Sequence, residues 1–193
     1  AASDVYKRQV YMGFGDGFNA RRSADNFTQE SFAKAVRYCH IRGCKVYVTL
    51  NTLVGDREMD AAAALAQQAS DAGADAILVQ DLGLARVLRA ALPDIPLHAS
   101  TQMSIHNLAG VEAAAEMGIT RAVLARELSL AEVAACRAAL HSARIEYFIH
   151  GALCVSYSGQ CYISEAITGR SANRGACAQL CRLPYDVYTA VSY

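Results

Sequence analysis

The sequence predicts an α/β protein of the (β/α)8 TIM-type barrel class, incomplete in this chain and followed by a cysteine-rich loop segment. Short, continuous apolar runs alternate with longer amphipathic stretches through residues 10–153. Continuous apolar runs are typical of buried parallel strands, and strict strand–helix alternation indicates βαβ units. No glycine-rich dinucleotide fingerprint follows any run, which weakens a doubly wound alternative. The domain boundaries follow, with a partial barrel at 10–153 and the cysteine-rich segment at 154–186.

Six strands and five helices are expected in alternation. The strands are predicted at 10–14, 45–51, 75–81, 96–102, 121–127 and 146–153. The helices between them are predicted at 28–43, 57–73, 82–92, 107–118 and 130–143. Gly43, Gly73 and Gly118 stand just past three helices, in the position where glycine commonly ends a helix. Ser129, followed three residues later by Glu132, forms a capping box for the last helix.

Length and composition set the broad class of the protein. A chain of 193 residues is long enough for one domain with a hydrophobic core, and 18 basic residues cancel 18 acidic ones. No apolar run approaches the roughly 20 residues of a membrane span, and no signal-peptide hydrophobic region is present. We therefore expect a cytoplasmic protein with no membrane partner. The segments 1–9 and 187–193 match neither the periodicity nor the composition between them, and are expected to be non-native ends of an internal piece.

Polar residues follow five of the predicted strands, where a barrel of this class carries its chemistry. Some polarity is expected wherever a strand meets a loop, but five successive polar ends favour a ligand-binding mouth. The predicted catalytic residues are His98, Gln102, Arg126, Glu127 and His150. The predicted substrate-binding residues are Asn51, Gln80 and Asp81, joined by a basic stretch of Arg170, Arg174 and Arg182. These arginines could bind phosphate or a carboxylate donor, or be ordinary surface charge.

Four of the seven cysteines cluster at Cys154, Cys161, Cys177 and Cys181. Thiolates suit zinc, copper(I) or an iron–sulfur cluster, and the irregular spacing favours a cluster over a zinc knuckle. A disulfide, an inert buried set, and a lone nucleophile with His150 as its base are the alternatives. The other three cysteines, Cys39, Cys44 and Cys136, are predicted to be small apolar core residues.

The cysteine segment also resembles a known family. The stretch "YFIHGALCVSYSGQCYIS", followed by "GRSANRGACAQLCRLPY", closely resembles the signature of the collagenase-like peptidase family U32. The upstream stretches "NFTQESFAKAVRYCHIRGCKVYVTLNTLV" and "HASTQMSIHN" are similar to the same family. The resemblance implies a 4Fe–4S cluster on Cys154, Cys161 and Cys177, with the fourth ligand either Cys181 or a cysteine further downstream. "CAQLC" stands where the family pattern has "CAQPC".

The resemblance also implies a function. Members resemble oxygen-independent hydroxylases of a ribosomal RNA cytidine, a transfer RNA wobble uridine or the ubiquinone ring, with prephenate as the hydroxyl donor of the RNA members. "GRSANRG" looks more like the RNA branch, which predicts an RNA substrate. A peptidase is the second hypothesis, although no Ser/His/Asp order or H-E-x-x-H helix is identifiable. A non-catalytic, metal-stabilised module is the third. An open barrel also exposes strand edges, through which homo- or hetero-oligomers could form.

Overall fold

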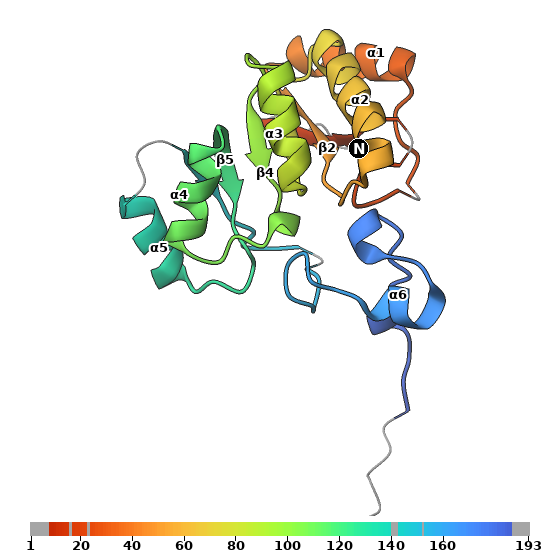
Figure 1. Cartoon of the computed structure of the whole chain (residues 1–193), viewed down its shortest axis with the longest axis vertical. Coiled ribbons are helices and arrows are strands. Elements are labelled where there is room, and N and C mark those ends of the chain that lie inside the picture. Colours follow the sequence, from red (N-terminus) through yellow and green to blue (C-terminus); the bar gives the residue numbers. More distant parts are fainter. Residues whose placement is uncertain (1–7, 16, 23, 140–142, 152, 187–193) are drawn as a thin grey trace, which may run out of the picture.

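The computed structural model describes residues 8–15, 17–22, 24–139, 143–151 and 153–186. Within them, six parallel strands form one sheet in the order β1-β2-β3-β4-β5-β6, so each strand pairs with the next along the chain (Figure 1). The strands are β1 (Gln9–Gly13), β2 (Lys45–Leu50), β3 (Ala76–Val79), β4 (Leu97–Ala99), β5 (Ile119–Val123) and β6 (Arg144–Glu146). The predicted strand–helix alternation is confirmed.

A helix joins each strand to the next. These helices are α1 (Gln29–His40), α2 (Met59–Asp71), α3 (Leu82–Ala91), α4 (Leu108–Glu116) and α5 (Leu130–Ala139). Three of these helices have an N-capping side chain. The side-chain oxygens of Thr28, Asp81 and Asn107 accept hydrogen bonds from N–H groups of the first turn that would otherwise be unpaired. The predicted capping box is confirmed, since the Ser129 N–H donates to Glu132 at 2.7 Å and the Glu132 N–H donates to Ser129 Oγ at 3.3 Å.

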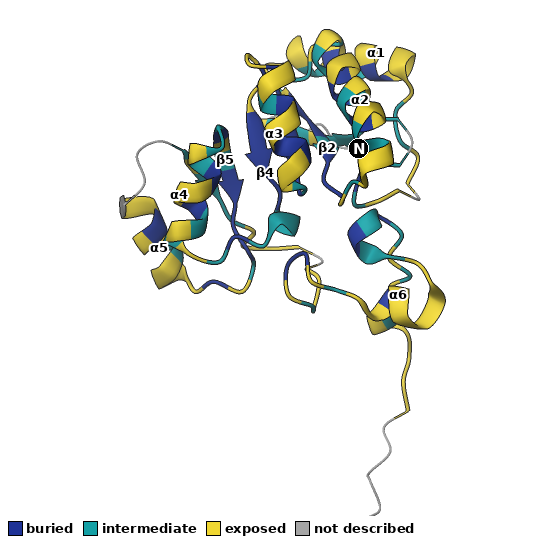
Figure 2. Ribbon diagram, in the orientation of Figure 1, coloured by how far each residue is buried: buried dark blue, intermediate teal, exposed yellow. Residues whose placement is uncertain are grey.

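The sheet separates two apolar layers. The larger lies between the sheet and the helices, where strands and helices carry dark blue, buried segments (Figure 2). Phe32, Leu50, Ile77 and Leu84 are fully buried in this layer. Burying a side chain of this size contributes about 1.5–3 kcal/mol. The smaller layer lies on the opposite face of the sheet and contains Tyr47, Ala76, Leu78 and Val123. Strands buried on both faces explain the continuous apolar runs of the sequence.

The sheet is curled into a half-barrel. Its first and last strands, β1 and β6, stand at opposite ends of the strand order, yet their side chains meet. The Tyr11 hydroxyl donates to the Glu146 carboxylate, and Gln9 Nε2 donates to it at 3.2 Å. Arg121 of β5 pairs with the same carboxylate at 2.9 Å. Contact between the two edge strands requires strong curvature, whereas closure into a ring of eight strands stays a prediction.

Several predicted boundaries differ from the structure, since β3, β4 and β5 end at Val79, Ala99 and Val123, before the predicted ends at 81, 102 and 127. The sixth strand was expected at 146–153, but β6 ends at Glu146, and Phe148 and Ile149 are 42% and 85% exposed. That prediction was wrong because the apolar run after Glu146 leaves the sheet and is not buried. Gln9, expected in a non-native end, belongs to β1. The segments 1–7 and 187–193 lie outside the described residues.

Beyond the strand-connecting helices, the cysteine segment contains α6 (Ile163–Thr168) and the single turns η3 (Ala172–Arg174) and η4 (Leu180–Arg182). Two more single turns, η1 (Asp56–Glu58) and η2 (Thr101–Met103), follow β2 and β4. Among the described helices, none has the length and apolar character that a membrane span requires.

Candidate functional site

The cysteine segment packs on the loops at the carboxyl ends of the strands. Two glycines allow this close approach. A Cβ at Gly159 would lie 2.1 Å from the backbone oxygen of Gln102, after β4, and a Cβ at Gly175 would lie 2.1 Å from that of Asn19, after β1. Both glycines have positive φ, at 72° and 74°, which other residues rarely adopt. At both places the backbone of the cysteine segment therefore packs directly against the backbone of a loop that follows a strand.

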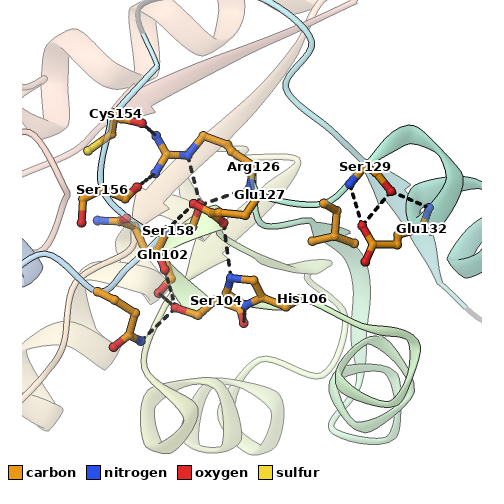
Figure 3. Close-up of polar contacts among 12 residues, drawn as sticks. Gln102, Ser104, His106, Arg126, Glu127, Ser129, Glu132, Cys154, Ser156 and Ser158 are labelled. Carbon is orange, nitrogen blue, oxygen red and sulfur yellow. Dashed lines mark hydrogen bonds and ion pairs between the residues drawn. The ribbon is translucent and has the colours of Figure 1, made fainter.

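Arg126, just past β5, holds the first part of this segment. Its guanidinium donates to the carbonyl oxygens of Cys154 at 2.9 Å and Ser156 at 3.2 Å, and its Nε donates to Ser158 Oγ at 3.0 Å (Figure 3). A planar guanidinium carries its donors in a fixed fork, so three bonds fix the path of the chain from Cys154 to Ser158. The predicted catalytic Arg126 thus positions a cysteine in this structure.

Glu127 also holds the turn that runs from Cys154 to Ser158. Its carboxylate accepts from the Ser158 N–H at 2.8 Å and lies 3.3 Å from His106 Nε2 (Figure 3). Burial acts to raise the pKa of Glu127, but hydrogen bonds from backbone N–H groups and from Ser158, with the nearby Arg126, lower it below its ordinary value. A carboxylate that stays ionised keeps these bonds intact. Ser104 completes the contact by donating to the Ser158 carbonyl at 2.6 Å.

A second anchor holds the later part of the segment. Arg174 donates to both carboxylate oxygens of Glu58, at 2.7 and 2.5 Å, and to the Leu53 carbonyl at 2.8 Å. The Arg174 hydrogen bond is the main reason that the pKa of Glu58 falls to about 2. The Leu53 N–H donates to the backbone carbonyl of Asn173. Arg174, predicted to bind substrate, therefore ties the segment to the loop after β2.

The four clustered cysteines line one cavity of about 380 Å³, together with Gln102 and Arg126. All four are free thiols; Cys161 is partly buried and the other three are exposed. Cys177 Sγ accepts a hydrogen bond from the Gln179 N–H at 3.3 Å. The donor chemistry of this set fits a thiolate-ligated centre. Among the described residues, however, no three His, Cys, Asp or Glu side chains already converge as metal ligands.

A second cavity, of about 420 Å³, opens inside the mouth of the half-barrel. Asn51, Ser100 and Gln102 contribute polar groups to its wall, and Cys154 and Arg126 line both cavities. Asn51 is fixed by two bonds, since it accepts from the Ala20 N–H and donates to Ser100 Oγ, both at 3.0 Å. The structure thus brings a hydrogen-bonding pocket and the cysteine cavity together at the strand ends.

Other predicted site residues lie away from these two cavities. Asp81 begins α3, accepting from the Leu84 N–H at 2.8 Å. Gln80 is buried, and its Oε1 has no hydrogen-bond partner in the structure. His98 is buried deeper in the half-barrel, where its ring meets that of Tyr47 edge-on at 4.8 Å. Burial, aided by the charge of Arg121, lowers the pKa of His98 to about 4, so the ring is neutral at physiological pH.

The remaining predicted residues lie on the surface. His150 is exposed beyond β6 and lines neither cavity, and Arg170 is exposed after α6. Arg182 donates to the Leu153 carbonyl at 3.3 Å and lines a third cavity beside Cys177 and Cys181. Catalytic or binding roles for these residues stay predictions.

The sequence reasoning missed the residues that fix the cysteine turn. Ser104, His106 and Ser158 make most of the contacts described above, and only the dipeptide Ser158–Gly159, a turn signal between two cysteines, could have indicated them. Of the cysteines outside the cluster, Cys136 is buried as predicted, and Cys39 packs partly against the core. The prediction was wrong for Cys44, which is partly exposed, and its thiol donates to the Lys45 carbonyl at 3.8 Å.

Comparison with known proteins now decides the family. The sequence matches the model described as Peptidase family U32 over residues 2–192. This chain belongs to peptidase family U32. The resemblance seen in the cysteine signature is thereby confirmed.

The relatives of this chain include RNA hydroxylation proteins and a collagenase of Porphyromonas gingivalis that is 38% identical over 189 residues. The chain is 49% identical over 178 residues to the 23S rRNA 5-hydroxycytidine C2501 synthase of Escherichia coli, covering 92% of this chain and 26% of that protein. It is 38% identical over 179 residues to tRNA hydroxylation protein P1 of Bacillus subtilis, covering 93% and 42%. The chain therefore spans between a quarter and a half of the length of these relatives.

A solved family structure has the same fold. The structure of the U32 peptidase Mk0906 superposes with a TM-score of 0.61 at 16% sequence identity, covering 76% of this chain and 62% of that one. At this identity the likeness concerns the fold alone, and it agrees with the half-barrel of parallel strands described above.

Proposed function

We propose that this chain forms the cluster-bearing part of an RNA hydroxylase acting on a ribosomal RNA cytidine or a transfer RNA uridine. The names of the two relatives support the reaction class. One structural observation supports this chain's part in it: four cysteines of a single segment line one cavity, directly beside a polar pocket at the mouth of the half-barrel.

The proposed cofactor is a 4Fe–4S cluster held by Cys154, Cys161 and Cys177, with Cys181 as the fourth ligand. Bound there, a cluster would supply electron transfer or Lewis acidity beside the pocket. The protein's own contribution is positional. Arg126 and Glu127 fix the turn that carries Cys154, while Arg174 fixes the part that carries Cys177.

The pocket at the mouth is the proposed site of the reacting base. A base inside a duplex is inaccessible to an enzyme, so the target nucleotide has to be unstacked or single-stranded. The amides of Asn51 and Gln102 and the hydroxyl of Ser100 can hydrogen-bond the edge of a pyrimidine. Prephenate, the proposed hydroxyl donor, carries two carboxylates. Arg126, in the pocket wall, is the cation that would meet one of them.

Peptidase activity is the alternative that the family name suggests, and it has less support. A cysteine nucleophile needs a neighbouring base. Three of the four described histidines, His40, His98 and His106, contact Asp75, Tyr47 and Glu127 instead. The fourth, His150, which was predicted as the base, is exposed and lines none of the three cavities that contain Cys154. A non-catalytic module predicts bound metal without any activity. Association through the edges of the half-barrel stays a prediction in either case.

Anaerobic purification, followed by iron and acid-labile sulfide assays and an absorption spectrum, tests the cofactor. We expect about four irons per chain and thiolate-to-iron charge-transfer absorption. Cys154→Ala and Cys177→Ala should abolish both, whereas Cys44→Ala, outside the cavity, should retain them. An iron-free protein with one reactive thiol would overturn the proposal.

Nucleoside mass spectrometry of ribosomal and transfer RNA tests the reaction. RNA from cells lacking the protein should lose 5-hydroxycytidine or 5-hydroxyuridine, and a plasmid copy should restore it unless Cys154 is replaced. Gelatin cleavage by the purified protein, with unchanged RNA, would favour the peptidase. Iron binding without either activity would favour the non-catalytic module.

A further inference from the structure

The face around Cys154 is cationic. The cysteine cavity, the mouth pocket and a third cavity of about 400 Å³ share Ala20 and Cys154 in their walls, so the three lie next to one another. The charged side chains in those walls are Arg21, Arg126 and Arg182; among the described residues that line them there is no Asp or Glu. A hollow lined by one sign of charge concentrates ligands of the opposite sign. Arg21 and Arg182 lie outside the wall of the cysteine cavity, and they are therefore the side chains of this face that suit an anion.

The same face carries exposed aromatic rings. Tyr157 and Tyr162 are 66% and 57% exposed, and both line the cysteine cavity. Contacts hold both side chains at the rim: the Tyr157 ring lies 6.3 Å from that of His106, and the Tyr162 hydroxyl donates to Gln160. Proteins that bind unpaired bases commonly stack them on exposed aromatic rings beside a positively charged groove.

We infer that this face binds a single-stranded stretch of RNA, with bases stacked on Tyr157 and Tyr162 and phosphates at Arg21 and Arg182. Arg182 also donates to the Leu153 carbonyl, which holds its guanidinium near the rim of the hollow. The inference rests on the proposed function and adds the surface that recognises the substrate. The stacking surfaces are available only when bases are unpaired, so a duplex should bind more weakly.

An apolar peptide fits these observations less well. Val155 and Ile163 beside the tyrosines would suit it, at 82% and 43% exposure. An apolar peptide, however, brings no negative charge to this face. Phosphates match its arginines, because every nucleotide brings one negative charge.

Fluorescence anisotropy with a labelled single-stranded RNA of about ten nucleotides tests the inference on the purified protein. Tyr157→Leu and Tyr162→Leu should each weaken binding about tenfold, and Phe at either position should restore it because the ring is retained. Tyr38→Leu on α1, at an exposed tyrosine away from this face, should have no effect.

Salt dependence tests the arginines. Arg21→Met and Arg182→Met should each reduce the slope of log affinity against log salt by about 0.7, the value of one phosphate contact on a single strand. Arg86→Met, on the exposed surface of α3, should leave the slope unchanged. Circular dichroism and the unfolding midpoint confirm that every variant is folded.

Three results would overturn the inference: equal binding by the leucine and phenylalanine variants, equal binding of a duplex of the same sequence, or displacement of the RNA by an apolar peptide. Because binding requires neither iron nor turnover, its failure is separable from that of the proposed function. Intact hydroxylation with no effect of these substitutions would refute the surface alone. RNA binding by this face, with no hydroxylated nucleoside in cells, would refute the proposed reaction alone.

Discussion

The guanidinium of Arg126 donates to the backbone carbonyl of Cys154 at 2.9 Å, joining the end of β5 to the first cysteine of the cavity. The two residues are 28 positions apart in the chain, and the contact uses a main-chain oxygen, leaving the Cys154 thiol exposed. An arginine at the mouth of the half-barrel thus fixes a cysteine without occupying its sulfur.

Replacing Arg126 by methionine should loosen the cysteine turn. The substitution removes a charged donor shared by Cys154, Ser156 and Ser158, and hydrogen bonds to a charged group contribute about 1.5–3 kcal/mol. We expect a lower free energy of unfolding in urea and a loss of bound iron in the anaerobic protein. Arg137→Met, on the exposed face of α5, is the matched control. Full iron content in the Arg126 variant would show that the turn holds its shape without this side chain.

Gly159→Ala and Gly169→Ala form a pair that separates backbone strain from packing. Both glycines have φ near 70°, so alanine costs each about 1–2 kcal/mol. Only at Gly159 does the new methyl group meet another chain segment, the Gln102 carbonyl oxygen at 2.1 Å, whereas nothing lies within 4 Å at Gly169. The Gly159 variant should therefore lose much more stability and become more sensitive to proteolysis within 154–161. Equal losses would mean that the cysteine segment does not rest on the loop after β4.

The buried His98 should make stability depend on pH. Its pKa is about 4 in the folded protein against an ordinary value of 6.5. The unfolded chain therefore takes up a proton as the pH falls through 6.5, while the folded protein does so only near pH 4. The stabilisation is complete above pH 6.5 and is lost progressively toward pH 4, by roughly 3 kcal/mol in total.

Urea unfolding at several pH values between 7 and 4.5 measures this effect. His98→Leu should flatten the dependence of the free energy of unfolding on pH. His150→Gln, at an exposed histidine, should leave that dependence as it is. If the two variants have the same pH profile, His98 is not the group responsible.

Breaking the pair between Glu58 and Arg174 should release the later cysteines. The pKa of Glu58 is about 2, against an ordinary value of 4.5. The stabilisation by this ion pair is therefore fully present above pH 4.5 and is lost as the pH falls toward 2. Glu58→Gln should increase iron release to a chelator at neutral pH. Arg174→Met should add to it in the double variant only the loss of its bond to the Leu53 carbonyl, because both substitutions remove the same ion pair. Glu30→Gln, in the exposed pair with Lys34, is the control. Additive effects of the two substitutions would show that they act separately.

The sequence predicted the repeating framework because β3 and β4 in the middle of the sheet are buried on both faces and the helices bury one face, and such burial gives the sequence a recognisable spacing of apolar residues. The same pattern failed at Phe148 and Ile149, where apolar residues are exposed. Asp81 illustrates a second difficulty: a carboxylate after a strand can serve a ligand or begin a helix, and here it begins α3. The contacts of Ser104 and His106 with the cysteine turn join loops that are far apart in sequence, which no local pattern reveals.

The polar side chains that join β1 and β6 have a mechanical consequence. Hydrogen bonds between neighbouring strands fix the twist of each strand pair. The distance between the edge strands β1 and β6 depends on the twists of all five pairs together. The contacts of Gln9 and Tyr11 with Glu146 fix that separation directly, by the lengths of side chains. The radius of the sheet, and with it the width of the mouth, is therefore held by the carboxylate of Glu146, the last residue of β6.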